Sequence, residues 1–351
     1  MIKENSKILF FSELFFVILQ PKNQISEEMA IRTIPQTLNF RPRMKQVLFF
    51  LLLLASCAKE SPASASMQTS SQEESISPSS SQAEDKEVDV FVFMGQSNMA
   101  GRGDKEKATP CPEGHGYEFR AISDPSKLYD LEEPFGVNEN NSHINDGTKK
   151  TGSLVSSFCE AYYQIRNVPI IGVSASQGGT SSTQWQPGGG MVEEAASRLS
   201  DCLNYLYSLD DLSIAHIEMV WLQGENDAGN AVSYETYKNN LQNIVDVMKD
   251  AGVEHCFTIQ IGPYMASESQ EKHDLYEVFH QNQIKMAEEM EDVDLCSIKL
   301  SGVPESMMHD KNHFYQEAYN IVGLDAGTNV AKYLEEGAMP ELLPFQEGDA
   351  S

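Results

Sequence analysis

One serine stands where a nucleophile is commonly placed. Ser97 lies in the segment 95–101 (GQSNMAG), directly after the apolar run Val88–Met94 (VDVFVFM). That run is typical of a buried strand, and a serine among small residues at a strand end suits acyl transfer. Such a serine needs a base for its proton, an acid that orients the base, and donors for the oxyanion. The pattern predicts a serine esterase.

The segment His309–His313 (HDKNH) offers the base and the orienting acid. Asp310 and His313 are three residues apart, which places carboxylate and imidazole side by side on one helical turn or in a tight loop. Asp310 would then hold the ring in the tautomer that leaves its other nitrogen free for Ser97. Two alternatives stay open. One is a solvated polar loop, and the other is a metal site with His309 and His313 as ligands, although no third ligand set is evident.

Two further polar segments follow predicted strands and offer oxyanion donors. The segment 177–181 (QGGTS) contains glycines, whose backbone N–H groups can approach a substrate without a side chain in the way. A simple turn is the alternative interpretation. The segment 223–227 (QGEND) offers the neutral side-chain amides of Gln223 and Asn226. Met99 breaks the G-x-S-x-G pattern around Ser97, which argues against an ordinary α/β-hydrolase.

These segments must be positioned by alternating strands and helices. Five apolar, β-branched stretches read as strands: Val88–Met94, Val168–Ser174, Ile214–Leu222, His255–Ile261 and Val293–Leu300. Five amphipathic stretches read as helices: Ser153–Arg166, Met191–Leu209, Tyr234–Ala251, Gln270–Met290 and Gln316–Leu334. The alternation predicts an α/β fold, a flavodoxin-like doubly wound, five-stranded parallel sheet with helices on both faces. Ligands bind such sheets at the carboxyl ends of the strands, where every candidate segment falls.

The composition limits the class of partner. The formal net charge of -27 makes nucleic acid and anionic membrane poor partners. The hydrophobic content of 40% is enough for a sizeable core. Cys159, Cys202 and Cys256 have apolar neighbours, which predicts buried thiols. Arg102–Lys150, rich in Gly, Pro, Asp and Asn, is expected to be a loop that borders the site. Trp221 is expected in the core, whereas Trp185 either packs within its loop or stacks on a sugar.

The amino-terminal region predicts export. From Met44 a basic residue, an apolar run at 47–54 (VLFFLLLL) and the tetrapeptide 54–57 (LASC) follow one another, and LASC resembles the bacterial lipobox. Cys57 would then carry a lipid, the alternative being a plain secretory signal. We interpret residues 1–43 as a start assigned too early or a genuine extension. We expect residues 58–87 to form a disordered serine-rich tether, 88–336 the esterase domain and 337–351 a tail. An exported bacterial lipoprotein, in the periplasm or on the cell surface, is expected.

Taken together, four blocks resemble the SGNH hydrolase superfamily. They are GQSNMAGRG, GGTS followed by Trp185, W-x-Q-G-E-N-D-A, and D-K-N-H, in this order. The likeness is greatest to carbohydrate esterase family 6 and the sialate O-acetylesterase group. It implies that Ser97 is the nucleophile and that Asp310 and His313 complete the triad. It also implies an oxyanion N–H from Gly179, with Gly178 a close rival. For the third block, the esterase subgroup uses the position of Gln223 and the wider superfamily that of Asn226.

The resemblance also implies a substrate class and the absence of a cofactor. It implies a serine acetylesterase that removes O-acetyl groups from carbohydrate, such as acetylated xylan, another hemicellulose, pectin or sialic acid. No metal and no organic cofactor are expected. Two alternatives are a lipid esterase or thioesterase of the same superfamily and a non-catalytic carbohydrate-binding lipoprotein. Membrane contact is expected only through the lipid anchor on Cys57.

Overall fold

The computed structural model describes residues 86–350. The predicted signal peptide, Cys57 and all but the last two residues of the predicted tether lie outside this range. They therefore stay predictions from the sequence. Among the described residues, no helix combines the length and the apolar character that crossing a membrane requires.

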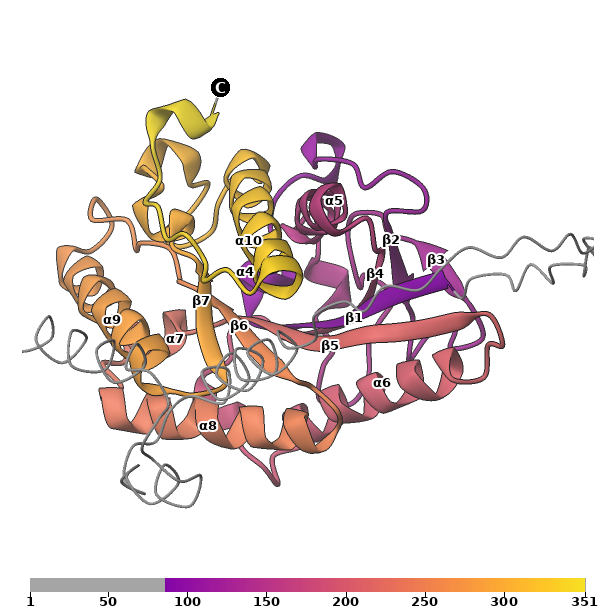
Figure 1. Ribbon diagram of the computed structural model, residues 1–351. Coiled ribbons are helices and arrows are strands. Elements are labelled where there is room, and N and C mark those ends of the chain that lie inside the picture. Colours follow the sequence, from indigo (N-terminus) through magenta and orange to yellow (C-terminus); the bar gives the residue numbers. More distant parts are fainter. Residues whose placement is uncertain (1–85, 351) are drawn as a thin grey trace, which may run out of the picture. The chain divides into compact units, whose positions relative to one another are not determined.

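A seven-stranded sheet forms the centre of the domain (Figure 1). Its order is β3-β2-β4-β1-β5-β6-β7, and only the β2–β3 pair is antiparallel within the described part of the chain. The strands are β1 Lys86–Gly95, β2 Gly116–Phe119, β3 Leu128–Asp130, β4 Ile170–Ser176, β5 Leu212–Leu222, β6 His255–Ile259 and β7 Val293–Ser297. The run β4-β1-β5-β6-β7 has the flavodoxin-like order of a doubly wound sheet. The predicted fold class is confirmed.

The predicted number of strands is wrong by two. Both additional strands, β2 and β3, lie in the segment 102–150, which the sequence predicted as a loop. They are four and three residues long and are bounded by glycines, prolines and polar residues. A run that short shows no alternation of apolar and polar residues that distinguishes it from a turn. Pairing with β4 therefore determines where β2 forms, and β3 pairs with β2 as the edge strand of the sheet.

Helices cover both faces of the sheet, as predicted. In Figure 1, α5 and α10 lie above the sheet and α6 and α8 lie below it. The helices are α4 Ser97–Ala100, α5 Val155–Arg166, α6 Met191–Leu206, α7 Glu225–Gly229, α8 Tyr234–Asp250, α9 Gln270–Glu289 and α10 Gln316–Glu336. Short 3-10 turns are η1 Lys105–Lys107, η2 Gly147–Lys149, η3 Ser182–Trp185, η4 Lys299–Gly302, η5 Glu305–Met307 and η6 Glu347–Ala350. Because both faces are covered, β1 is buried from Val88 to Gly95, and its sequence is an apolar run interrupted by Asp89.

Several side chains of uncertain role in the sequence belong to the core. Cys159, Cys202 and Cys256 are buried and free, as predicted. Trp185 and Trp221 are both buried and meet edge to face, with ring centroids 5.5 Å apart. The indole N–H of Trp185 donates to the Thr180 hydroxyl at 2.9 Å. Because this ring is enclosed, it has no face to offer a sugar, and the stacking alternative is wrong.

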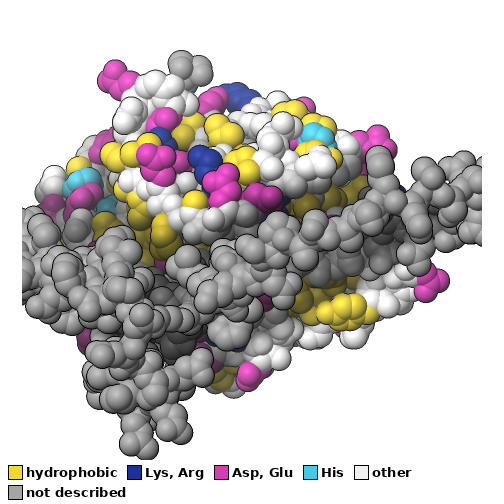
Figure 2. Space-filling view, viewed as in Figure 1, with side chains coloured by type: hydrophobic (Ala, Val, Ile, Leu, Met, Phe, Trp, Pro, Cys, Tyr) yellow, Lys and Arg dark blue, Asp and Glu magenta, His cyan; other side chains and the backbone are white. Residues whose placement is uncertain are grey.

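The surface reflects the acidic composition. Acidic side chains are spread over the face seen in Figure 2, with few Lys and Arg side chains between them. The formal net charge of the whole chain is -27. Such a surface disfavours the approach of polyanions by long-range repulsion.

Candidate active site

The nucleophile candidate lies where the order of the sheet reverses. Strand β1 has β4 on one side and β5 on the other, which makes its carboxyl end the topological switch point. Gly95 ends β1 with φ +138°, and a Cβ there would lie 2.0 Å from the Leu222 carbonyl oxygen. Only glycine permits this close turn against β5. Ser97 follows as the first residue of α4, with 6% of its surface exposed.

A tight loop brings the acid and the base together. Met308 and Phe314 form an isolated antiparallel bridge, and the His309 N–H donates to the His313 carbonyl at 3.0 Å. Inside this loop the Asp310 Oδ1 atom accepts the backbone N–H of Asn312 at 3.0 Å and that of His313 at 2.9 Å. The three-residue spacing therefore acts in a loop, which was one of the two geometries that the sequence allowed.

The loop places His313 between the serine and the aspartate. The Nε2 atom of His313 lies 2.8 Å from the Ser97 Oγ atom. Its Nδ1 atom lies 2.8 Å from Oδ2 of Asp310. Both ring nitrogens are thus engaged, which leaves none for a metal ion. The contact with Ser97, far away in the sequence, also distinguishes this segment from a merely solvated loop.

The surroundings set the charge of this pair. Burial lowers the pKa of His313 from its ordinary value; Asp310 raises it, and Arg102 and His309 lower it further. The net direction is down, so the ring is neutral and able to accept a proton near pH 7. Partial burial raises the pKa of Asp310, but the Asn312 backbone N–H and the His313 ring lower it more. The carboxylate therefore stays ionised beside the ring.

The two glycines after β4 have different environments. The Gly178 N–H donates to the Asp146 carboxylate at 2.9 Å and is not available to a substrate. Among the described residues, none accepts the N–H of Gly179. Gly179 has φ +77°, and a Cβ built there would meet no atom within 4 Å. The structure therefore leaves Gly179, the first choice from the resemblance, as the candidate donor.

The two amides after β5 also differ. Gln223 is fully buried, and its Nε2 atom donates to the Thr180 carbonyl at 3.1 Å and to Asp227 at 2.6 Å. Both of its N–H bonds are used within the fold, so the Gln223 prediction does not fit this geometry. Asn226 is half-buried, and its Nδ2 atom donates to the Gly179 carbonyl at 2.5 Å, which leaves its second N–H free. Asn226 is the better side-chain candidate for the oxyanion.

Comparison with known proteins agrees with this arrangement. A family model described as "Carbohydrate esterase, sialic acid-specific acetylesterase" matches residues 87–332. That span includes the whole sheet except Lys86, the first residue of β1, together with Ser97, Asp310 and His313. The chain belongs to this family. It is therefore a carboxylic ester hydrolase, and the resemblance to the SGNH carbohydrate esterases is confirmed.

Solved structures show the same fold at low sequence identity. A protein from Arabidopsis thaliana is similar with 19% identity and a TM-score of 0.53, over 70% of this chain and 98% of the other. A structure titled NanS is similar with 13% identity and a TM-score of 0.51, over 73% of this chain and 99% of the other. No curated protein matches the chain.

In this esterase, two buried residues that the sequence analysis missed, Asn98 and Glu225, connect the motif blocks by hydrogen bonds. The Asn98 amide donates to the Asn312 carbonyl at 3.1 Å and to the Glu225 carboxyl at 2.5 Å. Tyr319 donates to the Asn98 side-chain oxygen at 2.7 Å. Asn98, which follows the nucleophile in the chain, therefore holds the loop of His313 in place next to Ser97. Its place next to Ser97 was a signal that could have identified it.

Burial also affects Glu225. It raises the pKa of this carboxyl to about 7, although the Asn98 amide lowers it. A carboxyl with a raised folded-state pKa destabilises the fold as it ionises. The destabilisation by Glu225 therefore grows as the pH rises from 4.5, the ordinary pKa of this carboxyl, towards about 7.

Proposed function

We propose that the protein removes O-acetyl groups from carbohydrate by a Ser-His-Asp mechanism. The observation that carries the proposal is the position of His313, within 2.8 Å of both Ser97 and Asp310 at the carboxyl edge of the sheet. The family description, which names a sialic acid-specific acetylesterase, supports an O-acetylated sugar as the substrate.

The reaction follows from this geometry. The Ser97 hydroxyl gives its proton to His313 as its oxygen attacks the acetyl carbonyl carbon. Negative charge then develops on the carbonyl oxygen, towards which the Gly179 N–H and the Asn226 amide donate. Collapse breaks the bond to the sugar, and His313 returns the proton to the departing sugar oxygen. Water, activated by His313, releases acetate from Ser97.

Acetate release from a panel of substrates tests the substrate class. We expect release from acetylated sialosides or from an acetylated polysaccharide such as xylan or pectin. With 4-nitrophenyl esters, the rate should fall from acetate to octanoate. A rate that rises with chain length would instead support a lipid esterase or thioesterase. Sugar binding without any acetate release would support a non-catalytic carbohydrate-binding protein.

The choice of oxyanion donor has its own test. We expect Asn226→Ala to lower kcat by about 10²–10³-fold with little change in KM, because one donor to the developing charge is lost. The matched control is Asn243→Ala, whose amide in α8 contacts Gln186 at 2.8 Å, and it should keep the wild-type kcat. An Asn226→Ala enzyme with the wild-type kcat would remove this residue from the mechanism.

We also propose, from the sequence alone, that the protein is exported and lipid-anchored at Cys57. The basic residue, the apolar run and the LASC tetrapeptide at 54–57 support this. Incorporation of a labelled fatty acid that Cys57→Ser abolishes would be the direct test.

A further inference from the structure

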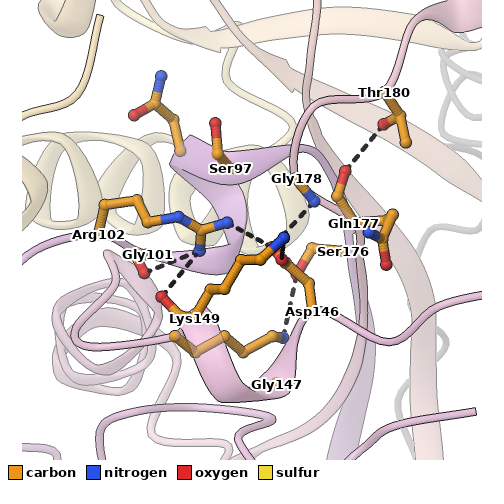
Figure 3. A network of polar contacts seen from close by, with 12 residues as sticks. Ser97, Gly101, Arg102, Asp146, Gly147, Lys149, Ser176, Gln177, Gly178 and Thr180 are labelled. Carbon is orange, nitrogen blue, oxygen red and sulfur yellow. Dashed lines mark hydrogen bonds and ion pairs between the residues drawn. The ribbon is translucent and has the colours of Figure 1, made fainter.

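A buried carboxylate lies beside the candidate oxyanion loop without being part of the proposed triad. The side chain of Asp146 has no exposed surface. Its Oδ2 atom accepts the Gly178 N–H at 2.9 Å and lies 2.5 Å from the Arg102 guanidinium. Lys149 lies 3.6 Å from the other oxygen. Figure 3 shows the Arg102 guanidinium, the Asp146 carboxylate and the backbone nitrogen of Gly178 converging near Ser97.

The contact with Gly178 fixes the peptide that precedes the oxyanion donor. On the other side of Gly179, the carbonyl of that residue accepts from the Asn226 amide at 2.5 Å. The carbonyl of Thr180 accepts from Gln223 at 3.1 Å. The Gly179 N–H therefore lies between two peptide groups held by side chains. At φ +77°, a backbone without a Cβ would otherwise be free to rotate.

The segment that contains Asp146 also contacts the end of β4, where the glycine loop begins. Lys150, also buried, donates to the hydroxyls of Ser174 at 2.7 Å and Ser176 at 3.1 Å. Both serines are buried, and Ser176 is the last residue of β4 before Gln177. Residues 146–150 thus contact both the end of the strand and the glycine loop that follows it.

Arg102 makes the carboxylate compatible with its location. An unpaired carboxylate beside a developing oxyanion would oppose the negative charge of the transition state. The Arg102 guanidinium pairs with Asp146 and also donates to the carbonyls of Gly101 at 3.3 Å and Lys149 at 3.2 Å. Its side chain is 14% exposed. The pair can orient an N–H group without adding net charge to the site.

We propose that Asp146 and Arg102 are positioning residues for the deacetylation reaction: Asp146 holds the Gly178 peptide so that the Gly179 N–H faces the oxyanion, and Arg102 neutralises Asp146 and ties it to the segment after Ser97. This inference rests on the proposed function. Neither residue contacts the reacting atoms. Asp146 acts through the glycine loop, and Arg102 acts through its pairing with Asp146 and through its charge near His313.

The first test separates acceptance of the Gly178 N–H from the charge of Asp146. We expect Asp146→Ala to lower kcat by about 10–100-fold, with KM within about threefold, because the donor loses its orientation but the fold remains. Asp146→Asn keeps an acceptor oxygen and should recover kcat to within about fivefold of wild type. Circular dichroism and thermal melts accompany each assay.

The matched control is a second buried carboxylate–guanidinium pair, one member of which lies on β1. Asp89, at the start of the strand, lies 3.2 Å from Arg166. Asp89→Asn should leave kcat at the wild-type value even if it lowers Tm. The inference is overturned if Asp146→Ala keeps the wild-type kcat. It is also overturned if kcat in both Asp146 variants falls only in proportion to the loss of folded protein.

The second test measures how the charge of Arg102 affects the pKa of His313. The charged or titratable groups that act on His313 are Asp310, Arg102 and His309, and Arg102 lowers the pKa of this ring. In Arg102→Met, the acid limb of kcat/KM should move to higher pH, because His313 then holds its proton more tightly. Arg166→Met should leave the limb in place. An unmoved limb in Arg102→Met would contradict the electrostatic part of the proposal.

Comparison with Ser97→Ala separates this inference from the proposed function. If the wild-type protein releases acetate and Ser97→Ala does not, the proposed function stands. The Asp146 and Arg102 variants then test only the positioning roles of these two residues. If the wild-type protein releases no acetate from any substrate of the panel, the proposed function and the inference both fall.

Discussion

Ser97→Ala is expected to reduce acetate release to background, by about 10⁶-fold in kcat, which is the loss typical of enzymes deprived of a serine nucleophile. The reason is chemical, because no other atom can form the acetyl-enzyme once the Oγ atom is gone. Within residues 86–350, the hydrogen-bond partner of the Oγ atom is His313, so its removal should leave the fold unchanged. The measurement is kcat on 4-nitrophenyl acetate together with the thermal melting curve.

The control for this variant is a serine far from the site. Ser213, an exposed residue near the start of β5, is suited to the same substitution. Ser213→Ala should keep both the wild-type kcat and the wild-type Tm. If Ser97→Ala also kept the wild-type rate, the mechanism would be wrong, and the ester hydrolysis would have to come from another group.

Asp310→Asn is expected to lower kcat by about 10⁴-fold, the loss measured for the equivalent change in other serine hydrolases. The carboxylate accepts from Nδ1 of His313, which keeps Nε2 unprotonated and ready for the Ser97 proton. An amide nitrogen turned towards Nδ1 favours the opposite tautomer. The asparagine oxygen can still accept the backbone N–H groups of Asn312 and His313, so the loop should survive.

A second carboxylate–imidazole pair provides the control. His255 Nε2 lies 3.1 Å from Asp294 Oδ2, on strands β6 and β7 and away from Ser97. Asp294→Asn should leave kcat at the wild-type value. An Asp310→Asn enzyme within tenfold of wild type would show that His313 works without this carboxylate, as a dyad with Ser97.

Much of the site was predictable because its signals are local. The pattern GQSNMAG directly after a buried run placed Ser97 at a strand end. The three-residue spacing of Asp310 and His313 paired them whatever the rest of the fold does. Parallel strands bring their carboxyl ends to one edge, which is why segments far apart in sequence were expected to meet. The structure brings these three side chains together.

The choice between neighbouring donors was not predictable, because it depends on contacts distant in sequence. Gly178 and Gly179 are equivalent in the sequence, and the carboxylate of Asp146 distinguishes them by taking the first N–H. Gln223 and Asn226 are both neutral amides, but Gln223 is buried and its amide donates to the carbonyl of Thr180. Asn98 and Glu225 lie inside the motif blocks, but their hydrogen bond requires α4 and α7 to be adjacent.

By itself, the sequence determined the alternation of strands and helices, the doubly wound fold, and the serine, histidine and aspartate candidates. These follow from apolar periodicity and from spacings within a few residues. Tertiary structure alone decided the two short strands in the segment 102–150, the enclosure of Trp185, the available oxyanion donors and the pairing of Arg102 with Asp146. The physical reason is that burial and the satisfaction of each polar group depend on which distant segments pack together, and no local pattern of residues encodes that.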